Sequence, residues 1–452
     1  MKLKNYLPLI LLSITLQIQA QNNSPKVPFE GIDQTWQNGA DRRDSSVFKD
    51  MKYFTPSILI DINYNYSFSN PNDNTVIGST VLARHNEVQL NDAILGGDFN
   101  FKNARARFMT QLGTRASSVP RNDYSPYKGQ YDLANVYHNI SEAYAGYHFN
   151  KWYGINVDAG LFVSYIGLNS YYQAENWIYQ PSYTSDNTPF FFNGIRIQIF
   201  PTKNLKIEPW IINGWQSYGK FNKMPGFGGS VTWMSNNSNV KLITNSYYGT
   251  DAAGLPARKR YHSDNSFLWR YFNQPGRKGI TRMAFSFTGD IGWEKGGGVN
   301  GFDKSDPSNP AQYFASGMMY HRIWFGEKFA WTLGGGVMKN PGRYLVLYPT
   351  GQASPLPNPY NPTQTAGAFP FSANPGDQFQ AWDWSTNIDI MPTQNITFRI
   401  EYVHRGASVP YFAGHGGVTS QTGYTTTPLD PSWRPDLVRK EDKVIAALLF
   451  RL

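Results

Sequence analysis

The chain has 452 residues and no cysteine, which excludes a disulfide-stapled scaffold, a cysteine-based zinc site and a lipid anchor on an N-terminal cysteine. Charged residues make up only 16% of the chain, and the mean hydropathy of -0.47 excludes a bundle of apolar membrane helices. The net charge of +9 is not gathered into a dense basic run, so we do not expect nucleic acid as a partner. Abundant aromatic residues and glycine favour an all-β protein.

Residues 1–20 have the pattern of a cleaved secretory signal peptide. Lys2 and Lys4 form a short positive region, an apolar run over 7–16 follows, and Ala20 offers a small residue at the cleavage site. The alternative is a membrane anchor, but this apolar run is too short to span a bilayer core of about 30 Å. We therefore expect an exported protein. No other stretch is long and apolar enough for a membrane helix, so we do not expect a helix to hold it in a membrane.

The strand signal is a strict alternation of apolar and polar side chains. From Ile58 to Phe68 every second residue is apolar, while Asp61 and Asn63 lie between them, which predicts a strand with one apolar and one polar face. Similar runs cover 104–112, 142–149, 153–165, 195–199, 282–291, 329–337, 396–405 and 443–452. Weaker ones lie near 86–101, 205–215, 227–236, 240–249, 263–272, 311–325 and 379–391, giving about sixteen strands.

The connections between these strands alternate between short and long. Tight turns are expected at 102–103, 150–151, 201–204, 236–239, 326–327 and 392–395. Long polar or Pro-rich loops are expected at 69–85, 115–138, 166–189, 216–226, 250–262, 293–310, 340–378 and 406–441. This asymmetry is typical of a transmembrane antiparallel β-barrel with short periplasmic turns and long extracellular loops, located in the outer membrane. We therefore expect a periplasmic N-terminal segment at 21–52 and an outer-membrane barrel at 53–452.

Charged residues on the polar faces predict a water-filled lumen, because charges facing lipid are costly whereas charges facing water are not. The pore-lining candidates are Asp61, Arg105, Arg107, Glu142, Asp158, Arg196, Arg282, Arg322, Arg399, Glu401 and Arg405. Their excess of arginine suggests a mild preference for anions or polyhydroxyl solutes. The alternative is that these arginines pair with carboxylates on neighbouring strands and only brace the wall.

Two loops and the N-terminal segment are candidates for narrowing the lumen. Segment 166–189 is aromatic-rich, and segment 340–378 is long and poor in charge. The candidate constriction residues are Tyr171, Tyr172, Trp177, Tyr344 and Tyr348. Residues 21–52 could cap the barrel or insert into it. The leading hypothesis is a porin for passive diffusion of small hydrophilic solutes, and the alternative is a plugged or narrow barrel with a binding or structural role.

Several stretches resemble the OmpL-like β-barrel porin family of bacterial outer-membrane proteins. They are residues 29–36 (FEGIDQTW), 194–196 (GIR), 209–215 (PWIINGW), 225–228 (PGFG) and 399–405 (RIEYVHR). The resemblance covers roughly residues 29–452 and implies an outer-membrane barrel, with no agreed substrate and no catalytic residues. Such barrels often end in Phe, which the assembly machinery reads, whereas this chain ends Phe450-Arg451-Leu452.

Motifs of catalysis or metal binding are missing from the sequence. It contains no nucleophile elbow, no phosphate-binding loop and no zinc-protease motif, and its seven histidines are scattered. We therefore expect no enzyme activity, no cofactor and no metal. The expected partners are outer-membrane lipids, the barrel assembly machinery and small solutes, with a homotrimer suggested by analogy to other sixteen-stranded porins.

Overall fold

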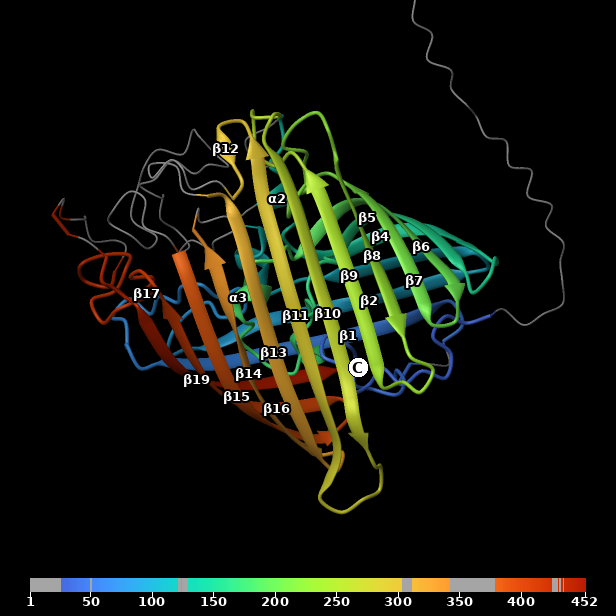
Figure 1. Cartoon of the computed structure of the whole chain (residues 1–452). Coiled ribbons are helices and arrows are strands. Elements are labelled where there is room, and N and C mark those ends of the chain that lie inside the picture. The colour runs from blue at the N-terminus through green and yellow to red at the C-terminus, as the bar shows by residue number, and fades with distance from the viewer. Residues whose placement is uncertain are drawn as a thin grey trace, which may run out of the picture.

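A closed antiparallel barrel forms the protein (Figure 1). The computed structural model describes residues 26–48, 51–120, 123, 129–302, 311–341, 379–424, 430, 432–433 and 435–452. Its main sheet has 17 strands, of which the two-residue β12 (Val299–Asn300) only extends β11, so sixteen strands form the wall. The barrel closes because β1 pairs with both β2 and β19. The predicted fold class and strand number are confirmed.

The wall strands follow one another around the barrel in sequence order. They are β1 (Phe54–Ser67), β2 (Val88–Phe101), β3 (Ala104–Thr110), β4 (Ile140–Phe149), β5 (Ile155–Val163), β6 (Phe191–Thr202), β7 (Leu205–Ile212), β8 (Gly226–Met234), β9 (Val240–Gly249), β10 (Lys259–Asn273), β11 (Ile280–Gly296), β13 (Tyr313–Phe325), β14 (Phe329–Asn340), β15 (Phe379–Thr393), β16 (Ile396–Ala407) and β19 (Lys440–Arg451). The short elements α1 (Arg115–Ser118), α2 (Leu133–Tyr137), η3 (Gln173–Glu175), α3 (Tyr183–Asp186), β17 (Phe412–Ala413) and β18 (Leu437–Val438) lie in the connections.

Short turns and long connections segregate to opposite ends of the barrel. The six predicted turns each join two consecutive strands, from β2 and β3 to β15 and β16. A seventh short connection, 274–279 between β10 and β11, was not among the predicted turns. The eight predicted long loops join the remaining pairs at the other end. Both ends of the wall, the start of β1 and the end of β19, lie at the short-turn end because the strand number is even.

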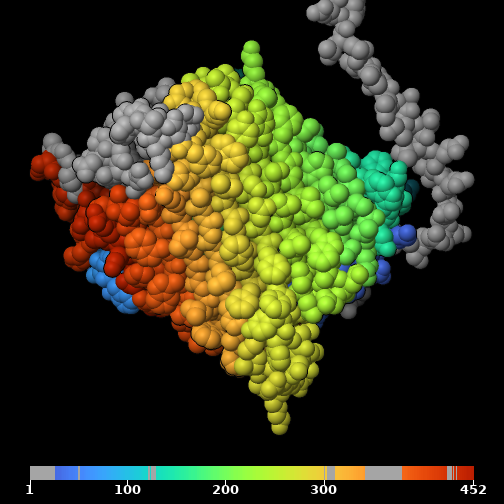
Figure 2. Space-filling model, in the orientation of Figure 1, coloured from blue at the N-terminus to red at the C-terminus, as the bar shows by residue number. Residues whose placement is uncertain are grey.

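The alternation seen in the sequence becomes the two faces of the wall. In β1, Asp61, Asn63 and Asn65 are buried on the inner face, whereas Tyr64 between them is exposed on the outer face. Apolar and aromatic side chains elsewhere share this outward parity, including Leu95, Trp331, Trp384, Ile388 and Ile400. Figure 2 shows the outer side as one continuous surface over β9 to β15. An apolar outer belt with aromatic residues is what a barrel wall presents to lipid.

Two long connections are clasped together beyond the wall. Asp73, between β1 and β2, accepts hydrogen bonds through Oδ2 from the backbone N–H of Val418 and of Thr419, both at 2.7 Å, and from the Thr419 hydroxyl at 2.8 Å. Burial raises the pKa of Asp73, but these backbone hydrogen bonds outweigh burial and hold it below its ordinary value of 3.8. The ionised carboxylate therefore stabilises the clasp.

We expect the clasp to open in acid. Because the folded-state pKa of Asp73 is depressed, its stabilisation is complete above the ordinary pKa and is lost as pH falls through the lower folded value. Amide hydrogen exchange of residues 416–420 should therefore accelerate, relative to strand amides, between about pH 5 and about pH 2. Asp73→Asn should show the faster exchange already at neutral pH. Asp430→Asn, a change at an exposed aspartate whose carboxylate accepts hydrogen bonds from the backbone N–H and the hydroxyl of Ser432, is the control and should change nothing. Equal exchange in wild-type protein and Asp73→Asn would contradict this role.

Candidate channel and its constriction

The connection between β5 and β6, residues 164–190, folds into the lumen; we call it the inner loop. Five of its aromatic side chains, Tyr171, Tyr172, Trp177, Tyr179 and Tyr183, are buried, although a surface loop of this composition would expose them. A buried loop must satisfy its backbone groups with hydrogen bonds. The inner loop does so with side chains that the opposite wall projects inward.

The centre of the inner loop is held by β15 and β16. The carboxylate of Glu401 accepts hydrogen bonds from the backbone N–H of Tyr179 at 2.5 Å and of Gln180 at 3.0 Å. The Asn387 side-chain amide donates to the carbonyl of Trp177 at 2.7 Å. These contacts join residues more than 200 positions apart in the sequence, so they fix the loop across the width of the lumen.

Ion pairs reinforce the same wall. Asp389 accepts from Arg322 at 2.7 Å and from Arg399 at 2.6 Å, and the Arg399 guanidinium also donates to the carbonyl of Asn176 at 2.7 Å. Buried charges persist only when they are paired and hydrogen-bonded. Asp389 therefore fixes two arginines that both hold the inner loop, because Arg322 donates to the carbonyl of Trp177 and Arg399 to that of Asn176.

Arg405 lies on β16 nearer the long loops and is fully buried. Its guanidinium pairs with Asp186 of the inner loop at 3.1 Å and also donates to the carbonyl of Gly78. It lies over the ring of Tyr183, with the guanidinium carbon 3.9 Å from the ring centroid, a cation–π contact. The inner loop is thus attached along the full set of strands from β13 to β16.

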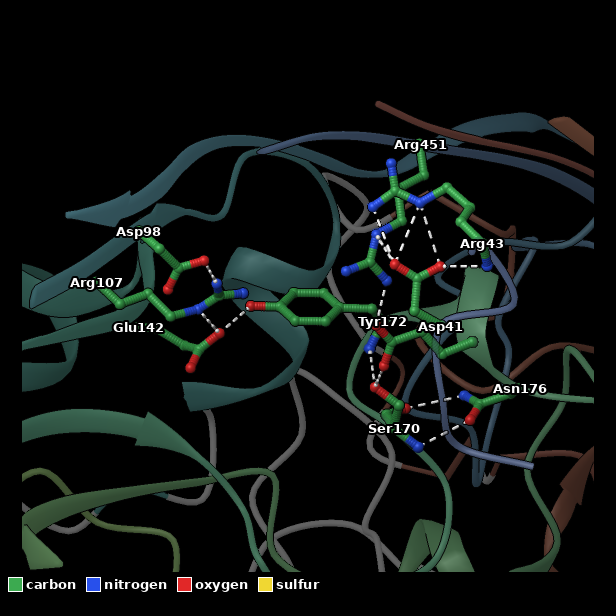
Figure 3. A network of polar contacts seen from close by, with 10 residues as sticks. Asp41, Arg43, Asp98, Arg107, Glu142, Ser170, Tyr172, Asn176 and Arg451 are labelled. Carbon is green, nitrogen blue, oxygen red and sulfur yellow. Dashed lines mark hydrogen bonds and ion pairs between the residues drawn. The ribbon is translucent and has the colours of Figure 1, made fainter. Parts of the chain in front are cut away.

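Two further contacts clamp the loop from the other side (Figure 3). The Tyr172 hydroxyl donates to Glu142 of β4 at 2.5 Å, and the Arg107 guanidinium of β3 donates to the same carboxylate at 2.8 Å. At the short-turn end, Glu175 pairs with Arg451 of β19. The loop therefore crosses the lumen from one wall to the other.

The N-terminal residues 26–48 form a second obstruction, at the short-turn end; we call them the N-terminal strap. The strap contacts the turn after β6 through Phe29, whose backbone N–H donates to the Lys203 carbonyl at 2.6 Å. It reaches the turn after β15 through Arg42, which donates to the carbonyls of Thr393 and Ile396 at 2.8 and 2.7 Å. Because these two turns belong to well-separated parts of the wall, the strap runs across the mouth.

Trp36 anchors the strap between these ends. Its side chain is fully buried, and its indole N–H donates to the carbonyls of Ser238 at 2.8 Å and Asp33 at 3.1 Å. Burial raises the pKa of Asp33, but hydrogen bonds from Thr35 and Arg270 outweigh it and hold the pKa below its ordinary value. Asp33 therefore stays ionised near neutral pH and pairs with Arg270 of the wall.

The strap and the inner loop also touch each other. The side-chain oxygen of Asn38 accepts from the backbone N–H of Trp177 at 3.0 Å, and the N–H of Gly39 donates to the carbonyl of Glu175 at 3.1 Å. Arg451 lies between Glu175 and Asp41 of the strap. The two obstructions are therefore one connected body inside the barrel (Figure 3).

Exposure of the inward charges separates two sides of the lumen. Side chains facing the inner loop are nearly inaccessible, with 2% of Arg399 and 0% of Arg405 exposed. On β2 and β3, by contrast, 42% of the Asp98 side chain and 23% of that of Arg105 remain exposed. Arg196 on β6 and Lys206 on β7 also keep 12% and 23% of their side chains exposed, so we call the part of the lumen along β2 to β7 the open side.

The structure places the sequence-predicted residues in three groups. Asp61, Arg322, Arg399, Glu401 and Arg405 lie on the inner face but contact or neighbour the inner loop. Arg105, Arg107, Glu142, Asp158 and Arg196 lie together on β3 to β6. Arg282 lies apart, near the short-turn end, where it pairs with Glu327 of the turn after β13. Many of these arginines form the cross-strand pairs that the wall-bracing alternative expects.

Of the constriction candidates, three are in the inner loop and two cannot be placed. Tyr171, Tyr172 and Trp177 are buried inside the barrel. Tyr344 and Tyr348 lie outside the described residues. Sequence reasoning missed Asp389 and Asn387 as key contacts. Both have inward parity on β15, so their alternation was a usable signal, but their partners in a loop could not be identified from it.

A closed, apolar-belted barrel with a polar, partly obstructed lumen defines a transmembrane β-barrel channel. The family model described as "Putative beta-barrel porin-2, OmpL-like" matches residues 53–427, and the chain belongs to this family. It is therefore a porin, as the leading hypothesis from the sequence held, and porins of this kind are channels for passive diffusion of solutes. The family is one of channels.

Several solved structures are similar in fold. The anion-selective porin from Comamonas acidovorans has 10% identity and a TM-score of 0.49, over 88% of this chain and 99% of that chain. The outer membrane channel DcaP of Acinetobacter baumannii has 9% identity and a TM-score of 0.48, over 88% and 97%. OmpT of Vibrio cholerae has 7% identity and a TM-score of 0.47, over 88% and 97%. No curated protein shows a significant sequence match to the chain. Among the described residues, no helix is long and apolar enough to cross a membrane.

Proposed function

We propose that this porin resides in the bacterial outer membrane and passes small solutes along the open side of its lumen. The observation that carries the proposal is the uneven exposure of inward charges: Asp98, Arg105, Arg196 and Lys206 on β2, β3, β6 and β7 keep part of their side chains exposed, whereas Arg399 and Arg405 facing the inner loop do not. Solutes would then follow a path narrower than the full barrel, bounded by the wall on one side and the inner loop on the other.

The charges on the open side support a mild preference for anions or polyhydroxyl solutes. Its partly exposed cations are Arg105, Arg107, Arg196 and Lys206, while the carboxylates Asp158, Glu142 and Glu208 beneath them are buried. Asp98 is the exposed exception and is bonded to Arg107. Charges that face the water of a pore act on passing ions, so the cationic face should dominate selectivity.

The remaining features of the proposal concern export and assembly. Residues 1–20 would be removed as a signal peptide, the strap within 21–52 would lie on the periplasmic side, and 53–452 would form the membrane domain. Outer-membrane lipids would cover the apolar belt, the barrel assembly machinery would insert the chain, and a homotrimer is the assembly proposed by analogy. No enzymatic activity is part of the proposal.

A plugged barrel with a binding or structural role is the second candidate. It is favoured by the connection between the strap and the inner loop, which together occupy much of the interior. The two candidates differ in one property, the conductance of the unmodified protein.

Single-channel recording in planar bilayers tests the choice. For the porin we expect discrete steps smaller than those of an unobstructed sixteen-stranded barrel, and a reversal potential in a KCl gradient that shows anion preference. Heat-modifiable migration should confirm that the recorded protein is folded. A folded barrel that never conducts would overturn the porin proposal and support the plugged barrel.

A further inference from the structure

Four residues form a row across the inner wall of the open side. Arg105 on β3, Gly146 on β4, Asp158 on β5 and Arg196 on β6 are direct cross-strand neighbours, each opposite the next. Directly opposite side chains in antiparallel strands lie about 5 Å apart and interact. The row therefore places one arginine on each side of a single carboxylate.

Gly146 allows that carboxylate to reach both arginines. A Cβ atom on residue 146 would lie 2.2 Å from Oδ1 of Asp158, so the Asp158 side chain occupies the space above the glycine. Its Oδ2 accepts from Nε of Arg196 at 3.0 Å, and its Oδ1 lies 3.4 Å from Nε of Arg105, two strands away. A side chain at position 146 would separate Asp158 from Arg105.

The row carries more positive than negative charge. Asp158 is fully buried and is shared by two guanidinium groups, which leaves one unit of positive charge at the water-facing surface. Of the nearby carboxylates, Asp98 and Glu142 both bond Arg107. Glu208 pairs with Lys206, and its charge also attracts Arg196. Arg105 and Arg196 remain 23% and 12% exposed, and Asp158 between them is fully buried, so an anion in the lumen meets the two arginines rather than the carboxylate.

Aromatic rings hold Arg196 in a fixed position. Its guanidinium carbon lies 4.5 Å from the ring centroid of Tyr144 and 4.6 Å from that of Phe162. The two rings stack against each other with centroids 4.8 Å apart. A guanidinium fixed in this way loses little conformational entropy when it binds, and its fork of N–H donors matches the geometry of a carboxylate.

We propose that Arg105 and Arg196 together form a binding step for the carboxylate group of a solute crossing the lumen. The inference rests on the proposed function and deepens it, because it assigns small carboxylates, including sugar acids, as a preferred solute class. Asp158 is a positioning residue in this site: it holds both guanidinium groups at one place without neutralising them both.

Binding is tested first without conduction. Saturation-transfer NMR of the folded, detergent-solubilised barrel should detect gluconate and give a much weaker signal for sorbitol, a polyol that lacks the carboxylate. Arg105→Gln and Arg196→Gln should each raise the dissociation constant of gluconate by about threefold or more. Arg282→Gln, which removes an arginine near the short-turn end, is the matched control and should leave that constant unchanged. Equal affinity for gluconate in both site variants and wild-type protein would overturn the proposal.

Recording across bilayers separates this inference from the proposed function. In a conducting barrel, Arg105→Gln and Arg196→Gln should each lower the anion-to-cation permeability ratio, whereas Arg282→Gln should leave that ratio unchanged. Unchanged selectivity in a conducting barrel would overturn the binding step and leave the porin function standing. A silent barrel that still binds gluconate through both arginines would support the site and overturn the proposed diffusion path.

Discussion

Deletion of residues 27–48 is expected to raise single-channel conductance about twofold or more, because the N-terminal strap lies across the short-turn mouth. The strap contacts turns on separate parts of the wall and holds the inner loop through Asn38 and Gly39. Its removal should widen the mouth and also loosen the inner loop, so brief closures should become more frequent. Conductance in symmetrical KCl measures the first effect, and dwell times measure the second.

Point variants within the strap make the expectation specific. Trp36→Ala removes the buried anchor and should reproduce part of the conductance increase, since the indole is fully buried and bonded to Ser238. Val47→Ala changes an exposed residue of the same segment and should conduct like the wild-type protein. A deletion variant with unaltered conductance would show that the strap does not limit flow.

The wall could be predicted from the sequence because membrane barrels obey a local rule. Side chains along each wall strand must point alternately to lipid and to the lumen. The polarity of Ile58 and of Asp61 therefore assigns each to the outer or the inner face without knowledge of any partner residue. The alternation of turn and loop lengths then sets the topology. The missed turn at 274–279 lies between two long strands whose extended ends weaken the contrast between strand and loop.

The interior could be predicted only in part, because a loop carries no such periodicity. The aromatic content of residues 166–189 suggested a constriction, but nothing in the order of Trp177 and Tyr179 indicates that Asn387 and Glu401 bind their backbone. The sequence likewise left the strap's position open. Several of its contacts are hydrogen bonds to backbone carbonyls, which every residue of the chain offers.

The row that contains Arg105 could likewise be predicted only in part from the sequence. Sequence parity put Arg105, Asp158 and Arg196 on the inner face but could not say which of them share a partner. That depends on Gly146, whose importance is evident only once strand register places it opposite Asp158. Register, rather than composition, decides whether inward arginines brace the wall or face a solute.

Replacement of Asp389 by alanine is expected to destabilise the barrel by roughly 3–5 kcal/mol, the usual cost of leaving a buried charge without its partner. Here two arginines, Arg322 and Arg399, would lose their shared carboxylate in a site where all three side chains are almost inaccessible. Arg399 also donates to the carbonyl of Asn176, so the inner loop should become more mobile. Urea unfolding of the barrel in lipid vesicles, followed by tryptophan fluorescence, measures the free-energy change.

The Arg282–Glu327 pair provides the control for this experiment. Its glutamate is largely exposed on a short turn, so water screens the interaction and Glu327→Gln should cost less than about 1 kcal/mol. The double variant Arg322→Met/Asp389→Asn removes the Arg322 charge together with its carboxylate partner. It should therefore recover part of the stability lost in Asp389→Ala. If Asp389→Ala unfolds at the same urea concentration as Glu327→Gln, the charges around Asp389 do not stabilise this wall. The inner loop must then be held mainly by Glu401 and Asn387, whose hydrogen bonds to the backbone at 177–180 remain intact in that variant.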